Sequence, residues 1–512
     1  MRALITAIGV SLLLCRIAAA GDLEAEVVRF SQRNFAEFLE FLSIENVASE
    51  PRDIQNNAAF LEDAFRKRGF EVRQVSNPAQ RPAVFAEYTG KVMGARTILF
   101  YIHFDGQPVI PEEWAQSDPF DPTIKKRDAS GQWIDVDRSQ LSHEPLDQEL
   151  RVFARAASDD KAPIMMMLTA IDILRAHGRM PAVNIKVILD GEEEIGSPSL
   201  AGMVEANHEL FEADALVILD GPVHGSGLPT LAFGNRGITE ATLTVFGPRN
   251  PLHSGHYGNY APNPAMRLAG LLATLKDDDG RVLIPGYYDG VEITSADREV
   301  LARTGDDEVA LRKRLGIAEA EKVGTSYQLS LQYPSLNVRG LASAAIGDKV
   351  ANIVPSDAVA ELDMRTTPET DGRHLFALVR EHIQRQGFHL VDGQPTDEDR
   401  QRYPRLASFR LGGVQAAQRM PMDSAVGRWA LHALQSPTGP DPTTEPVRIR
   451  MMGGTVPTDV LVSALQLTFI MVPTVNADNN QHAHDENLRM GNFITGTETI
   501  YSLLTTVFPA AE

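Results

Sequence analysis

Cysteine is nearly absent from this sequence of 512 residues, in which Cys15 is the only one. It lies in an apolar run, residues 3–15, that follows Arg2 and precedes three alanines at 18–20. A short positive start, an apolar run and a small-residue cleavage site are typical of a secretory signal peptide, so we predict that residues 1–20 are removed. The mature chain then has no cysteine, which excludes disulfides, a thiol nucleophile and thiolate metal ligands. Any metal site must use His, Asp and Glu side chains.

The apolar run at 3–15 is shorter than the about 20 apolar residues that a membrane-spanning helix needs, so we expect no stable membrane span. A lipid anchor on Cys15 is the alternative to cleavage after Ala20, although small neighbours would be expected there and the sequence has Leu14 and Arg16. The prediction is a protein that is secreted or periplasmic after the signal peptide is removed.

Positive charge is also scarce. The chain has 48 Lys and Arg against 68 Asp and Glu, a formal net charge of −20. Nucleic-acid binding requires a basic surface, so this class of partner is excluded. No internal repeat or low-complexity segment is visible, and the length predicts two domains.

Short apolar runs typical of buried strands alternate with helical patterns over much of the chain. The runs are residues 97–102, 183–189, 215–219 and 467–472. One helical pattern, 54–68, precedes them, and two others, 161–175 and 203–211, lie between them. Alternation of this kind predicts an α/β fold with a mostly parallel sheet flanked by helices.

The pattern changes after Gly237. Residues 238–246 and 358–365 alternate strictly between apolar and polar, a helical pattern covers 374–384, and 406–422 is rich in turn residues. Strict alternation predicts a sheet with one solvated face. We therefore predict a smaller α+β domain, residues 238–421, inserted into a larger domain made of 21–237 and 422–512.

Acidic and imidazole side chains cluster where the predicted strands end, which is the edge of an α/β sheet that binds ligands. They are His103 and Asp105 after 97–102, Asp159 and Asp160 before 161–175, Asp190 and Glu192 to Glu194 after 183–189, Asp220 after 215–219, and His482 after 467–472. Each segment alone has an ordinary explanation. The pair Asp159 and Asp160 is typical of a helix N-cap, and the acidic run is typical of a solvated loop.

Together these residues supply the number of ligands that a two-metal site needs. Two imidazoles and three carboxylates suit two zinc ions that share a bridging carboxylate and a water molecule. Cobalt or manganese could substitute, because the ligand atoms are nitrogen and oxygen. Glu193 is left beside Glu194 and could face the water as a general base. Asp105 is within reach of the second nitrogen of His103 and could fix its tautomer.

Five segments in order, 103–108, 118–120, 154–162, 193–197 and 482–486, resemble the motifs of the M20 family of metallopeptidases, which contains dipeptidases, carboxypeptidases and amino-acid deacylases. The resemblance implies a catalytic domain with an inserted lid or dimerisation domain, and a homodimer. It also implies roles at the metal site: Asp159 bridges two zinc ions, His103 and Asp220 complete one site, Glu194 and His482 complete the other, Glu193 is the general base, and Asp105 orients His103.

In the smaller domain, the resemblance implies that His253 stabilises the oxyanion, often across a dimer. Asn352 and Arg365 match residues that hold the substrate carboxylate, and Gly453, Gly454 and Thr455 match a substrate-binding loop. The sequence departs from the family pattern at Ala154, Ala156 and Ala162, where glycine is usual, and at Asp485, where asparagine is usual. Because alanine resists backbone shapes that glycine permits, the loop around Asp159 is expected to shift.

The predicted function is hydrolysis of an amide bond by a metal-bridging water that Glu193 deprotonates. An aspartate at position 220 is, within the family, more often found with dipeptidases, so dipeptides or short peptides are the expected substrates. An N-acyl amino acid deacylase or a carboxypeptidase is the alternative. A non-catalytic metal-binding protein is the alternative of another class, and a two-metal phosphatase is disfavoured because basic residues that would clamp a phosphate are not evident.

Overall fold

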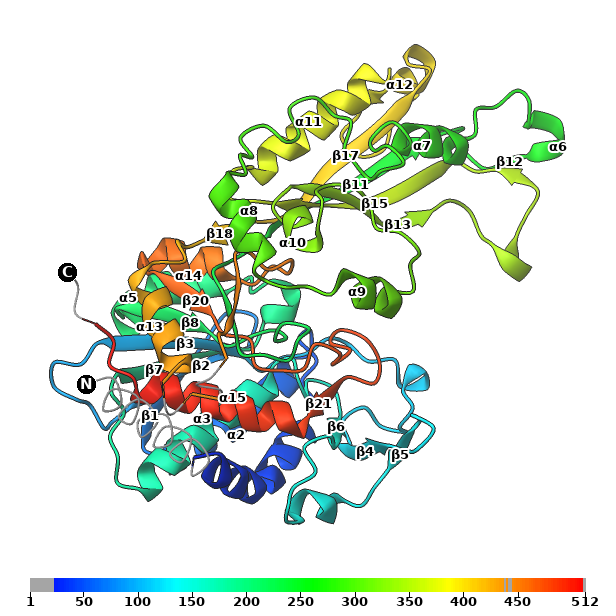
Figure 1. The fold of residues 1–512 in the computed structure, drawn as a ribbon. Helices are drawn as coiled ribbons and strands as arrows, with labels where there is room; N and C mark the ends of the chain where they lie inside the picture. The colour runs from blue at the N-terminus through cyan, green and yellow to red at the C-terminus, as the bar shows by residue number, and fades with distance from the viewer. Residues whose placement is uncertain (1–22, 437–438, 441–443, 510–512) are drawn as a thin grey trace. The chain divides into compact units, whose positions relative to one another are not determined.

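A computed structural model describes residues 23–436, 439–440 and 444–509 (Figure 1). The predicted signal peptide and Cys15 lie outside these residues. The chain divides into two compact units. The large unit contains the described residues of Met1–Phe233, Met420–Arg450 and Val456–Glu512, and the small unit is Gly234–Arg419 with Met451–Thr455. The sequence predicts an inserted domain at 238–421, and the role of that domain as a lid or dimerisation domain stays a prediction.

An eight-stranded sheet lies at the centre of the large unit, in the order β1-β2-β7-β3-β8-β20-β9-β19. Its four middle strands are parallel and almost wholly buried: β7 (Asn184–Asp190), β3 (Thr97–His103), β8 (Ala215–Ile218) and β20 (Phe469–Met471). The outer strands make the sheet mixed: β1 (Phe70–Val75), β2 (Ala83–Tyr88), β9 (Thr230–Ala232) and β19 (Val447–Ile449). All four predicted strand runs are found as strands, and the predicted α/β class is confirmed.

Helices flank this sheet. A helix over residues 23–42 opens the described chain, and the other long helices of the unit are α2 (Pro51–Lys67), α3 (Lys161–Ala176), α13 (Ala425–Leu434) and α15 (Met490–Thr505). In Figure 1, α15 lies beside α3. Every residue of α3 from Lys161 to Ile171 is buried, as expected for a helix that is apolar on most sides. Packing on most sides therefore fixes the start of this helix, directly after residues 155–160, which contain the predicted ligand Asp159.

A four-stranded sheet joins two distant segments of the large unit. Its order is β21-β6-β4-β5, formed by β21 (Asn487–Arg489), β6 (Arg151–Phe153), β4 (Thr123–Arg127) and β5 (Trp133–Asp135). Asn487 of β21 lies opposite Phe153 of β6 in antiparallel register. This pairing places the segment that precedes β21, with His482, beside the segment that follows β6, with Asp159.

The small unit is built on a five-stranded sheet. Its order is β13-β15-β11-β17-β16, formed by β13 (Ser335–Ala342), β15 (Asp357–Thr366), β11 (Gly237–Phe246), β17 (Leu406–Gln415) and β16 (His389–Leu390). Helices α7 (Pro264–Leu272) and α11 (Gly372–Arg385) pack against one face, where alternate residues of β11 are buried. The predicted alternation at 238–246 and 358–365 is therefore confirmed as strands of an α+β unit.

Two sequence-based expectations are wrong. Residues 406–422 were expected as turns, but β17 (Leu406–Gln415) pairs with β11 along most of its length. Its two glycines mark a bulge: a Cβ atom on Gly412 would lie 3.1 Å from the Cβ of Glu240, where the register shifts. The single helix expected at 203–211 is two short helices, α4 (Leu200–Ala206) and α5 (His208–Phe211), separated at Asn207.

The remaining elements are short. The large unit has one more α-helix, α14 (Thr458–Leu465), and the small unit contains β10 (Gly234–Asn235), β12 (Leu252–His253), α6 (Ser254–Tyr257), α8 (Ser295–Ala302), α9 (Glu308–Leu315), α10 (Tyr327–Ser330), β14 (Ile353–Val354), α12 (Asp397–Arg402) and β18 (Gln418–Arg419). Among the described residues, we find no helix with the length and apolar character that crossing a membrane requires.

Candidate metal centre

The predicted ligands of the large unit converge at the carboxyl edge of its sheet. His103 is the last residue of β3 and lies in register with Asp190, the last residue of β7. Glu193 and Glu194 follow β7 in the 3-10 turn η3 (Glu193–Ile195), and Asp220 lies two residues after β8. Because β7, β3 and β8 are parallel neighbours, these side chains meet at one edge of the sheet.

Two groups of candidate metal ligands form there. In the first, His103, Asp160 and Asp220 each offer a ligand atom, and these atoms lie within 4.8 Å of one another. In the second, Asp159, Glu194 and His482 meet the same condition. The structure therefore brings together all five predicted metal ligands, although the metal-binding roles stay predictions.

Asp159 links the two groups. Its Oδ1 lies 2.9 Å from Nε2 of His103, and its Oδ2 lies 3.1 Å from Nε2 of His482. The same imidazole nitrogen of His482 is 3.2 Å from Oε2 of Glu194. One carboxylate thus reaches an imidazole of each group with a different oxygen, which is the arrangement that a bridging ligand needs.

Asp160 departs from the helix-cap interpretation. It occupies the N-cap position of α3, but its side chain makes no capping hydrogen bond. Oδ2 instead faces the backbone N–H of His103 at 3.4 Å, and Oδ1 is buried without a hydrogen-bond partner. The capping explanation for this acidic residue is wrong, because its side chain points into the ligand cluster with His103 and Asp220.

The cluster concentrates negative charge in a buried place. Burial, with the charge of Asp159 as the next cause, raises the pKa of Glu194 to about 8 and that of Asp220 to about 6. Burial also raises the pKa of Asp160 and of Glu193 well above the usual range. For Asp159, burial acts in the same direction, but hydrogen bonds with His103 and His482 outweigh it and lower the pKa.

These residues fit divalent cations. Crowded, buried carboxylates favour protons over charge unless a positive charge compensates them, and a metal ion is such a charge. The buried Oδ1 of Asp160 has no hydrogen-bond partner, as is expected of an oxygen placed for a cation. The donor atoms are imidazole nitrogens and carboxylate oxygens, which suit zinc and, less selectively, cobalt or manganese.

Asp105 supports two ligands at once. Its Oδ1 lies 3.3 Å from Nδ1 of His103, and its Oδ2 accepts a hydrogen bond of 2.9 Å from the backbone N–H of Glu194. Two amides add contacts that the sequence did not predict: Gln107 donates to Oε2 of Glu194 over 2.8 Å, and Gln481 donates to Oδ2 of Asp159 over 3.1 Å. A carboxylate behind a ligating imidazole fixes its tautomer and orientation.

The alanines that replace the family's glycines differ in their backbone. Ala156 has φ of 59°, in the left-handed region that glycine adopts without strain, whereas Ala154 and Ala162 do not have positive φ. The loop therefore keeps a glycine-like shape at Ala156. Asp485 also has a positive φ, of 56°, and its Oδ1 accepts a hydrogen bond from the N–H of Ala115 over 2.9 Å.

The predicted substrate-binding residues of the small unit form two groups. Arg365 donates from Nη1 to Oγ1 of Thr455 over 2.7 Å, and that hydroxyl donates to the carbonyl oxygen of Arg236. Gly453 and Gly454 directly precede Thr455 in the same loop.

The second group lies where β12 pairs with β14. His253, on β12, pairs with Ile353, and the carbonyl of the neighbouring Asn352 accepts the N–H of Ser254 over 2.9 Å. The imidazole of His253 is exposed and lies 4.6 Å from that of His256, measured between ring centroids. The functional roles of both groups stay predictions.

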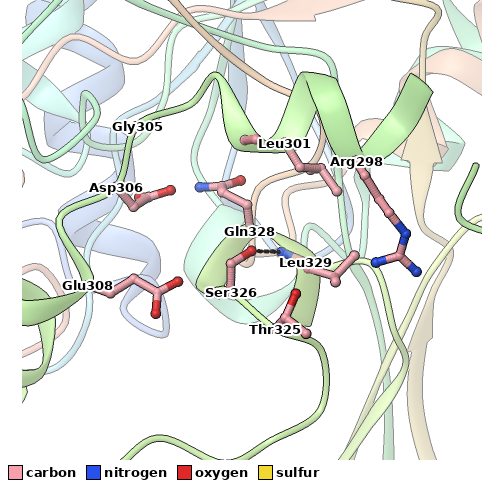
Figure 2. Close-up of a pocket in the computed structure, with 10 residues that line it drawn as sticks. Arg298, Leu301, Gly305, Asp306, Glu308, Thr325, Ser326, Gln328 and Leu329 are labelled. Carbon is pink, nitrogen blue, oxygen red and sulfur yellow. Dashed lines mark hydrogen bonds between the residues drawn. The ribbon is translucent and has the colours of Figure 1, made fainter. Parts of the chain in front are cut away.

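A cavity of about 290 Å³ lies elsewhere in the small unit, between α8 and α10 (Figure 2). Its lining contains the carboxylates of Asp306 and Glu308 and the guanidinium of Arg298. No imidazole and none of the predicted site residues lies among its lining residues.

Comparison with known proteins gives the family. The profile described as peptidase family M20/M25/M40 matches residues 99–506. The chain belongs to this family. As an M20 peptidase it is an enzyme, which removes the non-catalytic alternative, and the predicted family and peptidase activity are confirmed.

Individual relatives of this M20 peptidase cover most of its length. It is 27% identical over 421 residues to the Cys-Gly metallodipeptidase dug1 of Schizosaccharomyces pombe, covering 81% of this chain and 80% of that protein. It is 24% identical over 479 residues to the Beta-Ala-His dipeptidase of Mus musculus, covering 90% and 89%. The crystal structure of the M20 family metallo-carboxypeptidase Sso-CP2 from Sulfolobus solfataricus has a TM-score of 0.74 and 27% identity, covering 92% of this chain and 98% of that one.

Proposed function

We propose that this M20 peptidase is a dipeptidase that works with two divalent cations, most readily zinc. Sharing of Asp159 between the two ligand groups carries the proposal, since a carboxylate that contacts His103 with one oxygen and His482 with the other is suited to join two cations. One cation would be held by His103, Asp220 and Asp159, and the other by Glu194, His482 and Asp159. Bound zinc would lower the pKa of water and polarise the scissile carbonyl.

Glu193 is the proposed general base. It lies next to Glu194, and burial, followed by the charges of Asp220 and Glu194, raises its pKa, which is the direction in which enzymes tune a glutamate that acts as a general base and acid. Glu193 accepts a proton from the attacking water and returns it to the nitrogen of the leaving amine. The water adds to the carbonyl carbon, and the carbon–nitrogen bond then breaks to release a carboxylic acid and an amine.

The proposed substrates are dipeptides or short peptides with a free α-carboxylate. Arg365, held by Thr455, is the proposed partner of that carboxylate, because a guanidinium binds carboxylates in a bidentate fashion. The relatives named as a Cys-Gly metallodipeptidase and a Beta-Ala-His dipeptidase support dipeptides over N-acyl amino acids. Asn352 and the loop of Gly453 and Gly454 are proposed to contact the substrate.

Three further predictions belong to this proposal. His253 is proposed to stabilise the oxyanion, and the protein is proposed to work as a homodimer. The chain is proposed to be secreted or periplasmic after removal of residues 1–20. Its predicted partners are small substrates, with no nucleic acid.

A substrate screen tests the proposal. Metal is removed from the mature protein with a chelator, zinc is restored, and hydrolysis of Cys-Gly, β-Ala-His and other dipeptides is measured beside N-acetyl amino acids and longer peptides. We expect zinc-dependent cleavage of dipeptides and little cleavage of blocked dipeptide amides, which lack the carboxylate that Arg365 would bind. Turnover of N-acetyl amino acids alone would replace the dipeptidase with a deacylase.

A further inference from the structure

Glu486 is a buried carboxylate that receives an unusual number of hydrogen bonds from one short loop. Its residue is only 1% exposed. All five donors come from residues 155–159 of the ligand loop: Arg155 Nη1 at 2.8 Å and Ala156 N at 2.9 Å reach Oε2, while Ser158 N at 3.0 Å, Ser158 Oγ at 2.9 Å and Asp159 N at 2.9 Å reach Oε1. Three of these donors are backbone amides, so the carboxylate holds the course of the main chain itself.

Glu486 also connects two segments that are far apart in the sequence. It lies four residues after His482, and its own carbonyl accepts the N–H of Ala154 over 3.1 Å. One side chain therefore ties the segment of His482 to the segment of Asp159. A glutamate that served only to neutralise Arg155 would not need the three backbone donors.

The loop needs such a support. Ala156 has a left-handed backbone, which is strained for a residue with a Cβ atom, and its N–H is one of the donors to Glu486. Hydrogen bonds to a charged carboxylate are stronger than those to a neutral group and offset this strain.

We propose that Glu486 is a positioning residue that holds loop 155–159 in its ligand-ready shape, so that Asp159 lies between His103 and His482 before a cation binds. The proposal rests on the metal-binding role of Asp159 in the proposed function. Glu486 acts through the backbone of the loop and does not contact substrate. Its loss therefore weakens metal binding more than it changes turnover by the metal-saturated enzyme.

Glu486→Gln tests this role with little change of shape. The amide keeps one acceptor oxygen and replaces the other with an NH2 group. Because an NH2 group cannot accept, the donors that face it, either those of Oε1 or those of Oε2, lose their hydrogen bonds. Arg155 is only 3% exposed and would lose its carboxylate partner. The double variant Arg155→Met with Glu486→Gln separates the two effects, because it removes the guanidinium together with its counter-charge.

The experiment measures affinity for Zn²⁺, Co²⁺ and Mn²⁺ by competition with a chromophoric chelator, on the full mature protein after metal removal. We expect Glu486→Gln to bind zinc about 10- to 100-fold more weakly than the natural protein, as is usual for residues that support metal ligands. The double variant should stay weakened. With zinc at saturation, KM for a dipeptide should be unchanged and kcat should recover to within a few-fold.

Glu37→Gln is the matched control. Glu37 pairs with the largely buried Arg68, with 2.7 Å between Oε2 and Nη2, and its side chain bonds to this guanidinium rather than to a residue of the ligand cluster. It should lower the melting temperature and leave zinc affinity unchanged. Ser158→Ala, which removes one of the five donors and keeps the backbone, should weaken zinc binding a few-fold and decides the matter if Glu486→Gln does not fold.

Several results would overturn the proposal. Zinc affinity within twofold of the natural value in folded Glu486→Gln, or in Ser158→Ala if that is the variant available, shows that the loop does not need Glu486. Full recovery of affinity in the double variant shows that Glu486 only neutralises Arg155. If the natural protein binds zinc tightly but cleaves no dipeptide, the proposed function is wrong and the role of Glu486 in metal binding can still be tested. If it binds none of the three metals, the proposed function and the role of Glu486 are both wrong.

Discussion

The backbone N–H of Glu194 donates to Oδ2 of Asp105 over 2.9 Å, so one carboxylate fixes the turn that carries Glu194. The other oxygen of Asp105 lies 3.3 Å from Nδ1 of His103. Asp105 therefore connects a ligand at the end of β3 with a ligand that follows β7. Since His103 and Glu194 belong to different candidate cation groups, a change at Asp105 should affect both groups together.

Asp105→Asn should weaken zinc binding about 10- to 100-fold and lower kcat/KM, because an amide has only one oxygen and cannot both accept from the N–H of Glu194 and present an oxygen to Nδ1 of His103. Zinc titration and steady-state kinetics measure the two effects. Asp214→Asn is a suitable control, because Asp214 accepts the N–H of Thr97 at the opposite end of β3. If both variants bind zinc as the natural protein does, the supporting role of Asp105 is wrong.

Glu193→Gln should keep its metal and lose most of its turnover. The amide cannot accept a proton, and loss of a general base typically costs on the order of 10² to 10⁴ in rate. Elemental analysis gives the metal content, and dipeptide hydrolysis at saturating zinc gives kcat. Turnover near the natural rate in a fully metallated variant would remove Glu193 from this role.

Ala156→Gly should stabilise the protein. The left-handed backbone at φ of 59° is free of strain for glycine, and this gain exceeds the extra entropy of glycine in the unfolded chain, for a net of about 0.5 to 1 kcal/mol. Ala162→Gly, in the first turn of α3, should instead lower the free energy of unfolding, because glycine in a helix costs about 0.5 to 1 kcal/mol. Denaturant unfolding of both variants provides the comparison, and an Ala156→Gly variant no more stable than the natural protein would show that Ala156 is not strained.

Glu498 should make stability depend on pH. Burial in α15, with a smaller contribution from Glu24, raises its pKa to about 8. The folded state therefore keeps a proton that the unfolded state releases near pH 4.5, and the free energy of unfolding should fall as the pH rises from about 4.5 to about 8. At 1.36 kcal/mol per pKa unit, the rise from about 4.5 to about 8 corresponds to a total effect of about 5 kcal/mol.

Glu498→Gln should remove this part of the pH dependence, because the amide does not titrate. Melting temperatures of the two zinc-saturated proteins should diverge in favour of the variant as the pH rises through this window, while contributions from the metal-site acids cancel in the difference. Glu24→Gln should give only a small change, since Glu24 is the lesser cause. Parallel melting curves across the window would contradict the raised pKa.

The strands that carry the site were predictable because their signal is local. Residues 97–102 and 183–189 are mostly apolar, and each run is followed directly by His103 or Asp190. The strand Leu406–Gln415 was missed because its paired glycines read as a turn, whereas a bulge opposite Glu240 requires them. Such a bulge is defined by the partner strand, which sequence proximity does not show.

The sequence predicted which residues form the site better than it predicted the contacts between them. His103, Asp159, Glu194, Asp220 and His482 follow strand ends or match family motifs, and they do converge. Asp160 had the sequence signature of a helix cap, and only its buried side chain beside Asp220 shows otherwise. Nothing near Glu486 in sequence indicated that its hydrogen-bond donors lie at 155–159.

The order of the apolar runs determined the α/β class, and the polar residues that follow them determined the set of possible ligands. Both could be predicted from the sequence because hydrophobic burial and the alternation of strand and helix depend on the pattern of neighbouring residues. Tertiary structure alone decided which oxygen faces which nitrogen. The pairing of β6 with β21 brings Glu486 to the loop of Asp159 across more than 300 residues of chain. Hydrogen bonds and charge repulsion depend on distances of a few ångströms, and those distances exist only after the strands have paired.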